Sequence, residues 1–393
     1  MALQPASGAR DLLPQDVGAN RWICEQLAEV YRRWGYDEVM PPSIERLDTL
    51  EAGGAIEPSN VLQVVADEAL GLRPEMTASI ARAACTRLSS LQRPLRLHYS
   101  GSIFLAERRE GENPRVSEQL QSGVELMGAS ASAGDAELLR LLLDAAGHLP
   151  LSPEQQPTLL MGHQGLLALV LEGLPSELQR PCRQALCNLD RLGLRELPLN
   201  PAQRERLETV LNLRGEPAWV LEQLEALVGP SELFASLQGL VASVAQQAQG
   251  QGIRLQLDPS FQPQFALYDG LVLKLVCQGE FAPVAIASGG RYDRLVQRFS
   301  PNDPGASGVG FGFAVEEVRQ LLEVNAGLPP GGGGSEHLVA FARADQLNGA
   351  LDRLQEHHRQ GLRAELWPDP CASRAEAEQI AQRRGIASLD WLG

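Results

Sequence analysis

Hydrophobic residues near the start of the chain recur every three or four positions, a spacing that predicts an amphipathic helix over residues 17–34. Gly35 follows this segment, and glycine is typical of a helix end. A stripe of leucines predicts a second helix over residues 135–147. The two stripes consist of Trp22, Ile23, Leu27, Val30 and Tyr31, and of Leu138, Leu139, Leu142 and Leu143.

Shorter apolar runs predict the other elements of the first 326 residues. An extended run at residues 38–44 is interrupted by Pro41 and Pro42. From about residue 159 to 251 the composition shifts to Leu, Gln, Glu and Ala, which predicts a mostly helical insertion. We expect strands at residues 94–104, 117–127, 254–257, 265–268, 271–278, 284–288 and 308–313, and helices at 77–88 and 315–322.

Four consecutive glycines lie in the segment 327–336, which predicts a flexible linker after a core domain of residues 1–326. Residues 337–393 alternate between strand and helix patterns in the order βαβαβ. Three strands joined by two crossover helices form a small parallel α/β unit. The sequence therefore predicts two structural parts.

The composition is typical of a globular protein, with 44% hydrophobic and 21% charged residues among 393. We expect no membrane span, because no run of about 18 apolar residues occurs. The first residues do not resemble a signal peptide, and the six cysteines form no CxxC pair. These features indicate a cytoplasmic protein without disulfides, a metal site or a cofactor.

The net charge is 34 − 49 = −15, so a polyanion such as tRNA would be repelled except at a local basic surface. We therefore expect no nucleic-acid partner.

Four short motifs carry the candidate chemistry. Each has an ordinary structural explanation: the glycines at 289 and 290 suit a turn, and Glu75 with Thr77 suits a helix start. Gln121 and Glu125 are four residues apart on a predicted strand, so their side chains face the same side and need a partner or solvent. The motifs are GARDLLP at 8–14, LRPEMT at 72–77, QLQSGVE at 119–125 and SGGRYD at 288–293.

Together and in this order, the motifs resemble the class II aminoacyl-tRNA synthetases, and specifically the histidyl enzyme. The resemblance covers residues 8–128 and 255–322, and more weakly the C-terminal unit, which ends after its third strand. It implies an α+β fold with an antiparallel sheet flanked by helices, a truncated C-terminal α/β unit, and a dimer. In that family the residues that match Glu75, Thr77 and Gln121 hold the α-amino group of histidine. Those that match Glu125 and Tyr268 contact the imidazole, and the one that matches Tyr292 lines the pocket.

The chain departs from the synthetase pattern at three positions where the family has arginine. Here they are Leu105, Pro263 and Glu317. Adenylation builds negative charge that fixed cations must offset. Each arginine contact is worth about 1.5–3 kcal/mol, so losing three costs about 5–9 kcal/mol if the terms add. Arg108, Arg109 and Arg115, in the loop after Leu105, are alternative cations. We expect no synthetase activity and no catalytic residue.

A synthetase-like chain with the histidine pocket kept and the ATP site degraded resembles the regulatory subunits of ATP phosphoribosyltransferase. That family implies a partner of the short-form catalytic subunit in the first step of histidine biosynthesis, with feedback inhibition by L-histidine. Two enzymatic alternatives stay open. One is a divergent histidyl-tRNA synthetase, and the other is a paralogue that activates an amino acid for a non-tRNA acceptor. Leu105, Pro263 and Glu317 argue against both.

Overall fold

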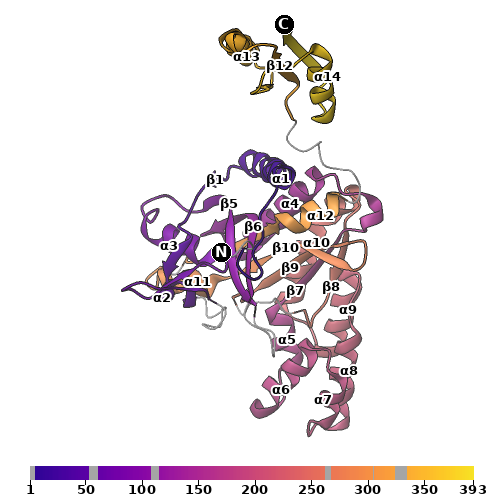
Figure 1. Ribbon diagram of the computed structural model, residues 1–393. Helices are drawn as coiled ribbons and strands as arrows, with labels where there is room; N and C mark the ends of the chain where they lie inside the picture. The colour runs from indigo at the N-terminus through magenta and orange to yellow at the C-terminus, as the bar shows by residue number, and fades with distance from the viewer. Residues whose placement is uncertain (1–4, 53–60, 108–114, 262–266, 304, 324–333) are drawn as a thin grey trace. The chain divides into compact units, whose positions relative to one another are not determined.

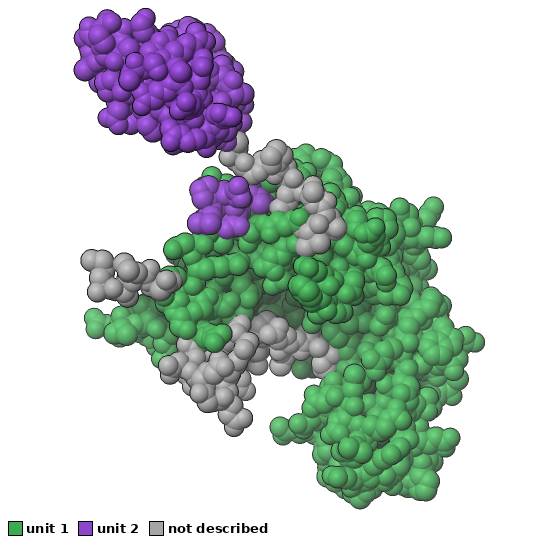
Figure 2. All heavy atoms as spheres, turned by 45° about the vertical axis from the view of Figure 1, so that its right-hand side comes forward, with its two compact units in different colours: residues 1–12, 20–328 green, residues 13–19, 329–393 purple. Residues whose placement is uncertain are grey.

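The computed structural model describes residues 5–52, 61–107, 115–261, 267–303, 305–323 and 334–393. The chain divides into two compact units, which are coloured separately in Figure 2. Unit 1 comprises residues 1–12 and 20–328, and unit 2 comprises residues 13–19 and 329–393. Most of the predicted linker, 327–336, lies outside the described residues. None of the described helices combines the length and apolar character needed to cross a bilayer.

An eight-stranded mixed sheet forms the centre of unit 1, in the order β1-β5-β6-β11-β10-β9-β7-β8 (Figure 1). Its interior pairs are antiparallel, as the sequence predicts, but the two edge pairs, β1 with β5 and β7 with β8, are parallel. The predicted antiparallel sheet is therefore confirmed in its interior, and two parallel pairs are added at its edges. The strands are β1 (Asp37–Glu38), β5 (Leu95–Glu107), β6 (Arg115–Met127), β7 (Thr158–His163), β8 (Arg254–Leu257), β9 (Leu271–Gln278), β10 (Pro283–Arg291) and β11 (Gly308–Ala314).

One face of this sheet carries the main apolar core. The stripes of α1 (Pro14–Arg33) and α4 (Ala131–His148) are buried in one cluster with Val124 and Phe311 of the sheet. The helix α12 (Val315–Glu323) adds Val315 and Val318 to the same cluster. Gly35 adopts a φ of +78°, a left-handed conformation that ends α1 at little steric cost.

The opposite face of the sheet is covered by α3 (Thr77–Thr86) and α11 (Asp293–Phe299). Their apolar residues pack with Leu95, Leu97 and Tyr99 of β5 in a second cluster. A small antiparallel sheet in the order β2-β4-β3 leads into α3. It consists of β2 (Ile44–Arg46), β4 (Leu70–Leu72) and β3 (Gln63–Val64), with α2 (Leu47–Glu51) beside it.

Six helices between β7 and β8 form the predicted insertion, and α5 to α9 gather at one end of the sheet (Figure 1). The insertion is predicted from about residue 159, but residues 158–163 form β7, so its helices begin at Gln164. Leu159 and Met161 bury one side of β7, a pattern hidden by the leucine-rich sequence that follows. A short 3-10 helix at Pro153–Gln155 precedes β7. The helices are α5 (Gln164–Leu171), α6 (Ser176–Cys187), α7 (Arg191–Glu196), α8 (Pro201–Asn212), α9 (Pro217–Val228) and α10 (Glu232–Gly250).

Unit 2 contains the βαβαβ pattern that the sequence predicts. Its three strands are all parallel, in the order β13-β12-β14. Alternate residues of β12 face opposite sides, so Val339 packs with α13 and Leu338 packs with α14. The elements are β12 (His337–Phe341), a 3-10 turn at Ala344–Gln346, α13 (Leu347–Arg359), β13 (Ala364–Leu366), α14 (Arg374–Arg383) and β14 (Ser388–Leu392).

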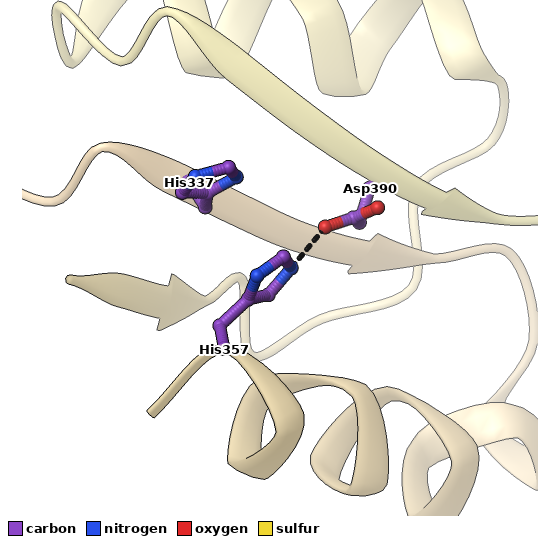
Figure 3. Close-up of side chains that lie close together, drawn as sticks. All are labelled: His337, His357 and Asp390. Atoms are coloured by element: carbon purple, nitrogen blue, oxygen red, sulfur yellow. Dashed lines mark hydrogen bonds and ion pairs between the residues drawn. The ribbon is translucent and has the colours of Figure 1, made fainter. Parts of the chain in front are cut away.

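A side-chain cluster also connects the elements of unit 2. His357 of α13 is buried, and its Nε2 bonds to the Asp390 carboxylate of β14 (Figure 3). The ring of His337 on β12 stacks on that of His357, with 4.4 Å between ring centroids. The cluster joins three elements that are far apart in sequence.

Candidate functional site

The face of the sheet toward α3 carries a row of glycines where the strands β6, β11 and β10 meet. Gly310 lies directly opposite both Glu125 and Gly290, and Gly312 lies opposite Gly123. Added Cβ atoms would collide here: one at Gly310 would lie 1.8 Å from Glu125 Oε2. These glycines leave space above the sheet that other side chains would fill.

A cavity occupies this space, with about 70 Å³ open to the centre of a water molecule. Since one water needs about 10–15 Å³ by this measure, the cavity has room for several waters or one small molecule. The predicted site residues that line it are Glu75, Thr77, Gln121, Glu125 and Tyr268.

Glu125 lies at the inner end of the cavity and is 1% exposed. Its carboxylate accepts a hydrogen bond from Thr77 Oγ1 at 2.7 Å and another from the Tyr292 hydroxyl. Burial raises the pKa of Glu125 to about 8, against the lowering effect of these two donors. This shift favours the protonated form, in which the side chain can donate a hydrogen bond as well as accept them.

Tyr292 has a different place from the other predicted residues. It is 1% exposed and does not belong to the described residues that line the cavity. Its hydroxyl instead donates a hydrogen bond to the Glu125 carboxyl group. Tyr292 directly precedes α11, and its backbone N–H bonds to the carbonyl of Gly308 at 2.8 Å.

Glu75 lies at the start of α3, where the family pattern and the helix-start explanation both apply. Its carboxylate accepts the backbone N–H groups of Thr77 at 2.5 Å and Ala78 at 2.9 Å. These donors would otherwise lack partners in the first turn. Burial still raises the pKa of Glu75 above its usual range. The carboxylate is thus positioned by the helix and also borders the cavity.

Tyr268 lies in the loop before β9, not in the strand predicted over residues 265–268. Residues 265 and 266 of that strand are outside the described residues, and Leu267 and Tyr268 make no ladder. The loop is held by the next residue: Asp269 accepts the backbone N–H groups of Asp293 and Arg294 at 3.1 and 2.7 Å. This anchor places Tyr268 at the cavity wall.

The prediction overlooked Lys274, the one basic side chain among the described residues that line the cavity. It lies in the middle of β9, whose sequence is LVLKLVCQ. Two signals could have found it. It is a single charge within an apolar central strand, and it is the only lysine in the chain.

Two of the three altered synthetase positions lie beside a second hollow, near the start of β6. Leu105 pairs with Ser117, which lines this hollow, and Glu317 lines it directly. The third, Pro263, is outside the described residues, as are Arg108 and Arg109. Among the described residues, the charged ones that line the hollow are Arg10, Glu118, Glu316 and Glu317. The three carboxylates of this set outnumber its one guanidinium and disfavour a polyphosphate.

Comparison with known proteins identifies relatives over the whole chain. The family model described as histidyl-tRNA synthetase matches residues 8–318. The chain is 63% identical over 393 residues to the ATP phosphoribosyltransferase regulatory subunit of Synechococcus sp. (strain RCC307). It is 49% identical to the regulatory subunit of Prochlorococcus marinus (strain MIT 9303), and both alignments cover 100% of each chain.

Two solved structures share the fold. A Bacillus halodurans protein described as an ATP phosphoribosyltransferase regulatory subunit/histidyl-tRNA synthetase has a TM-score of 0.82 and 24% identity. The alignment covers 99% of this chain and 98% of that chain. The histidyl-tRNA synthetase of Nostoc sp. PCC 7120 has a TM-score of 0.77 and 19% identity, with 98% and 90% covered. These matches confirm the predicted class II synthetase-like fold.

Proposed function

This chain belongs to the family of ATP phosphoribosyltransferase regulatory subunits, and we propose that it acts in histidine biosynthesis as a non-catalytic partner of the short-form catalytic subunit. The name that its relatives carry supports a complex with a catalytic ATP phosphoribosyltransferase, and the short form of that partner and the pathway step are what the family resemblance implies. The structural support is one observation: a cavity with polar groups suited to an amino acid lies near an acidic hollow that disfavours a triphosphate.

The proposed ligand of the cavity is L-histidine. Its ammonium group needs acceptors, which Glu75 and the side-chain carbonyl of Gln121 offer. Its imidazole has one nitrogen that donates and one that accepts. Glu125, whose raised pKa favours the protonated form, can pair with either nitrogen, and Tyr268 provides a second polar group. Thr77 and Tyr292 hold Glu125 in position.

Absence of synthetase activity is the second part of the proposal. Leu105 and Glu317 remove two cations from the region of the acidic hollow, and Glu317 adds a carboxylate. Without fixed cations, the developing charge of an adenylation transition state is not offset. We further propose a dimer of this chain within a larger assembly, and feedback inhibition through histidine bound in the cavity.

Histidine-dependent exchange of pyrophosphate into ATP separates this proposal from both enzymatic alternatives. We expect no exchange above background with the purified chain. Exchange within about tenfold of an ordinary synthetase would identify an active enzyme.

Calorimetric titration tests the ligand. We expect heat of binding with L-histidine and none with L-alanine, and loss of the histidine heat in Glu125→Ala. Equal heats for the two amino acids, or unchanged binding in the variant, would contradict a histidine site.

A further inference from the structure

Lys274 is the only lysine in a chain whose other 34 − 1 = 33 basic residues are arginines. It lies half-buried on β9, between the buried residues Leu273 and Leu275 on either side in sequence. A charge held within an apolar strand is costly unless an anion or solvent compensates it.

Among the described residues no carboxylate forms an ion pair with Lys274, and the two acidic residues that border the same cavity are Glu75 and Glu125. Its Nζ lies 5.7 Å from the centroid of the Phe261 ring, which also borders the cavity. A contact of this type contributes about 0.5–1 kcal/mol at an exposed site, which holds the ammonium in place without neutralising it.

The register of the strands places Lys274 on the same face of the sheet as Glu125. Lys274 lies opposite Ser288, Ser288 opposite Gly312, and Gly312 opposite Gly123. Directly opposed residues share a face, and Glu125 is two residues beyond Gly123, so it shares that face too.

Three strand-to-strand steps of about 4.8 Å separate the β6 and β9 backbones, or about 14 Å. Between these strands the floor is Ser288 and glycine, with no large side chain at the opposed positions. The Glu125 and Lys274 side chains therefore project over a gap of amino-acid size.

We infer that Lys274 binds the α-carboxylate of the amino-acid ligand, so that the cavity takes a free zwitterionic amino acid and selects against analogues without the carboxylate. This inference rests on the proposed histidine site and names its carboxylate partner. Glu75 then faces the ammonium group and Lys274 the carboxylate, so each charge of the ligand meets an opposite one.

The proline at position 263 bears on this assignment, because it removes a positive charge that the synthetase pattern has. The synthetase pattern has an arginine at this position, and this chain does not. Lys274 lies eleven residues further along the chain, on strand β9, and provides a positive charge in place of that arginine. Lysine provides a compact point charge with three N–H donors, which can pair with one carboxylate.

Titration calorimetry with two ligands isolates the carboxylate. L-histidinol keeps the imidazole and the ammonium of histidine but has a hydroxymethyl group in place of the carboxylate. The wild-type chain should bind histidine about tenfold to a hundredfold more tightly than histidinol, the range expected for a charge-assisted hydrogen bond. In Lys274→Met the two affinities should become equal, and Lys274→Arg, which keeps the charge, should retain most of the preference.

The outcomes separate this inference from the proposed function. If the wild-type chain binds histidine and histidinol equally, or Lys274→Met keeps the preference, the carboxylate assignment is wrong and the histidine site stands. If the wild-type chain binds neither ligand, the histidine site itself is wrong and the assignment falls with it.

A second measurement needs no variant. An amine-reactive ester can modify one side-chain amine in this sequence, that of Lys274, and the N-terminal α-amino group serves as an internal reference. Free amino acids also consume the ester, so the control contains L-alanine at the same concentration as histidine. Relative to that control, peptide mass spectrometry should show that histidine lowers the modification of Lys274 compared with that of the α-amino group. Equal modification of Lys274 with and without histidine would overturn the assignment.

Discussion

Glu125 and Lys274 lie on the same face of the central sheet, three strand-to-strand steps apart, at opposite sides of a floor of glycine and serine. Neither is exposed, and both border one cavity. An acid and a base held apart in this way do not neutralise each other. They suit a ligand that carries complementary groups at its two ends.

The raised pKa of Glu125 predicts how stability depends on pH. In the unfolded chain the group titrates near 4.5, and in the folded chain near 8. Between these values the folded state keeps a proton that the unfolded state has lost, so the free energy of unfolding falls as pH rises. The slope from this group is at most about 1.4 kcal/mol per pH unit.

Glu125→Gln should remove this share of the slope, because the amide is neutral at every pH. Urea unfolding of both proteins across the range between about pH 5 and pH 8 measures the difference. Parallel stability curves for wild type and variant would show that Glu125 is already ionised in the folded protein.

The glycines beneath the cavity leave no room for a side chain, so one added methyl group at Gly310 should lower both stability and ligand binding. Gly310→Ala places a Cβ 1.8 Å from Glu125 Oε2 and 2.6 Å from the Val124 carbonyl oxygen, so the strands or Glu125 must shift. We expect a loss of about 1–3 kcal/mol in unfolding free energy. We also expect loss of the rise in melting temperature that the proposed histidine site predicts for wild type.

Gly239→Ala is the matched control, since no atom lies within 4 Å of the added Cβ in α10. It should stabilise the chain by about 0.5–1 kcal/mol and keep the histidine-dependent rise. If Gly310→Ala kept that rise as well, the ligand would not lie on the glycine floor.

A buried ion pair predicts a large effect on stability away from the cavity. Arg291 is 4% exposed and binds Asp135 at 2.7 Å and Asp293 at 3.0 Å. Arg291→Met should cost about 3–5 kcal/mol, because it leaves the buried Asp135 carboxylate without a cation. Adding Asp135→Leu should restore part of the loss, and urea unfolding measures both. A cost below about 1 kcal/mol would mean that the pair is screened like a surface one.

How far the sequence predicts this fold depends on how local each signal is. The stripe of α1 and the βαβαβ order of unit 2 are set by nearby residues, and both are confirmed. β7 was missed because its apolar residues merge with a leucine-rich helix that follows directly. The parallel edge pairs join strands that are distant in sequence, and the short sequences of β1 and β8 do not indicate with which strand they pair or in which direction.

In the site, too, the sequence indicates individual residues but not the contacts between residues that are distant in the chain. The family motifs indicated five residues that border one cavity in the structure. The roles of these residues are a proposal. The hydrogen bond from Tyr292 to Glu125 joins residues 167 positions apart, and only the fold reveals it. Lys274 could have been found from its uniqueness, but its direction follows from the register across four strands.

We propose above all that this chain regulates a phosphoribosyltransferase and does not itself activate an amino acid. The most direct measurement is the rate of ATP phosphoribosyltransferase activity of a short-form catalytic subunit, with and without the full chain, combined with the mass of the mixture by light scattering. We predict a larger complex, a higher rate when the chain is added, and inhibition of that rate by L-histidine. An unchanged rate together with an unchanged mass would contradict the claim.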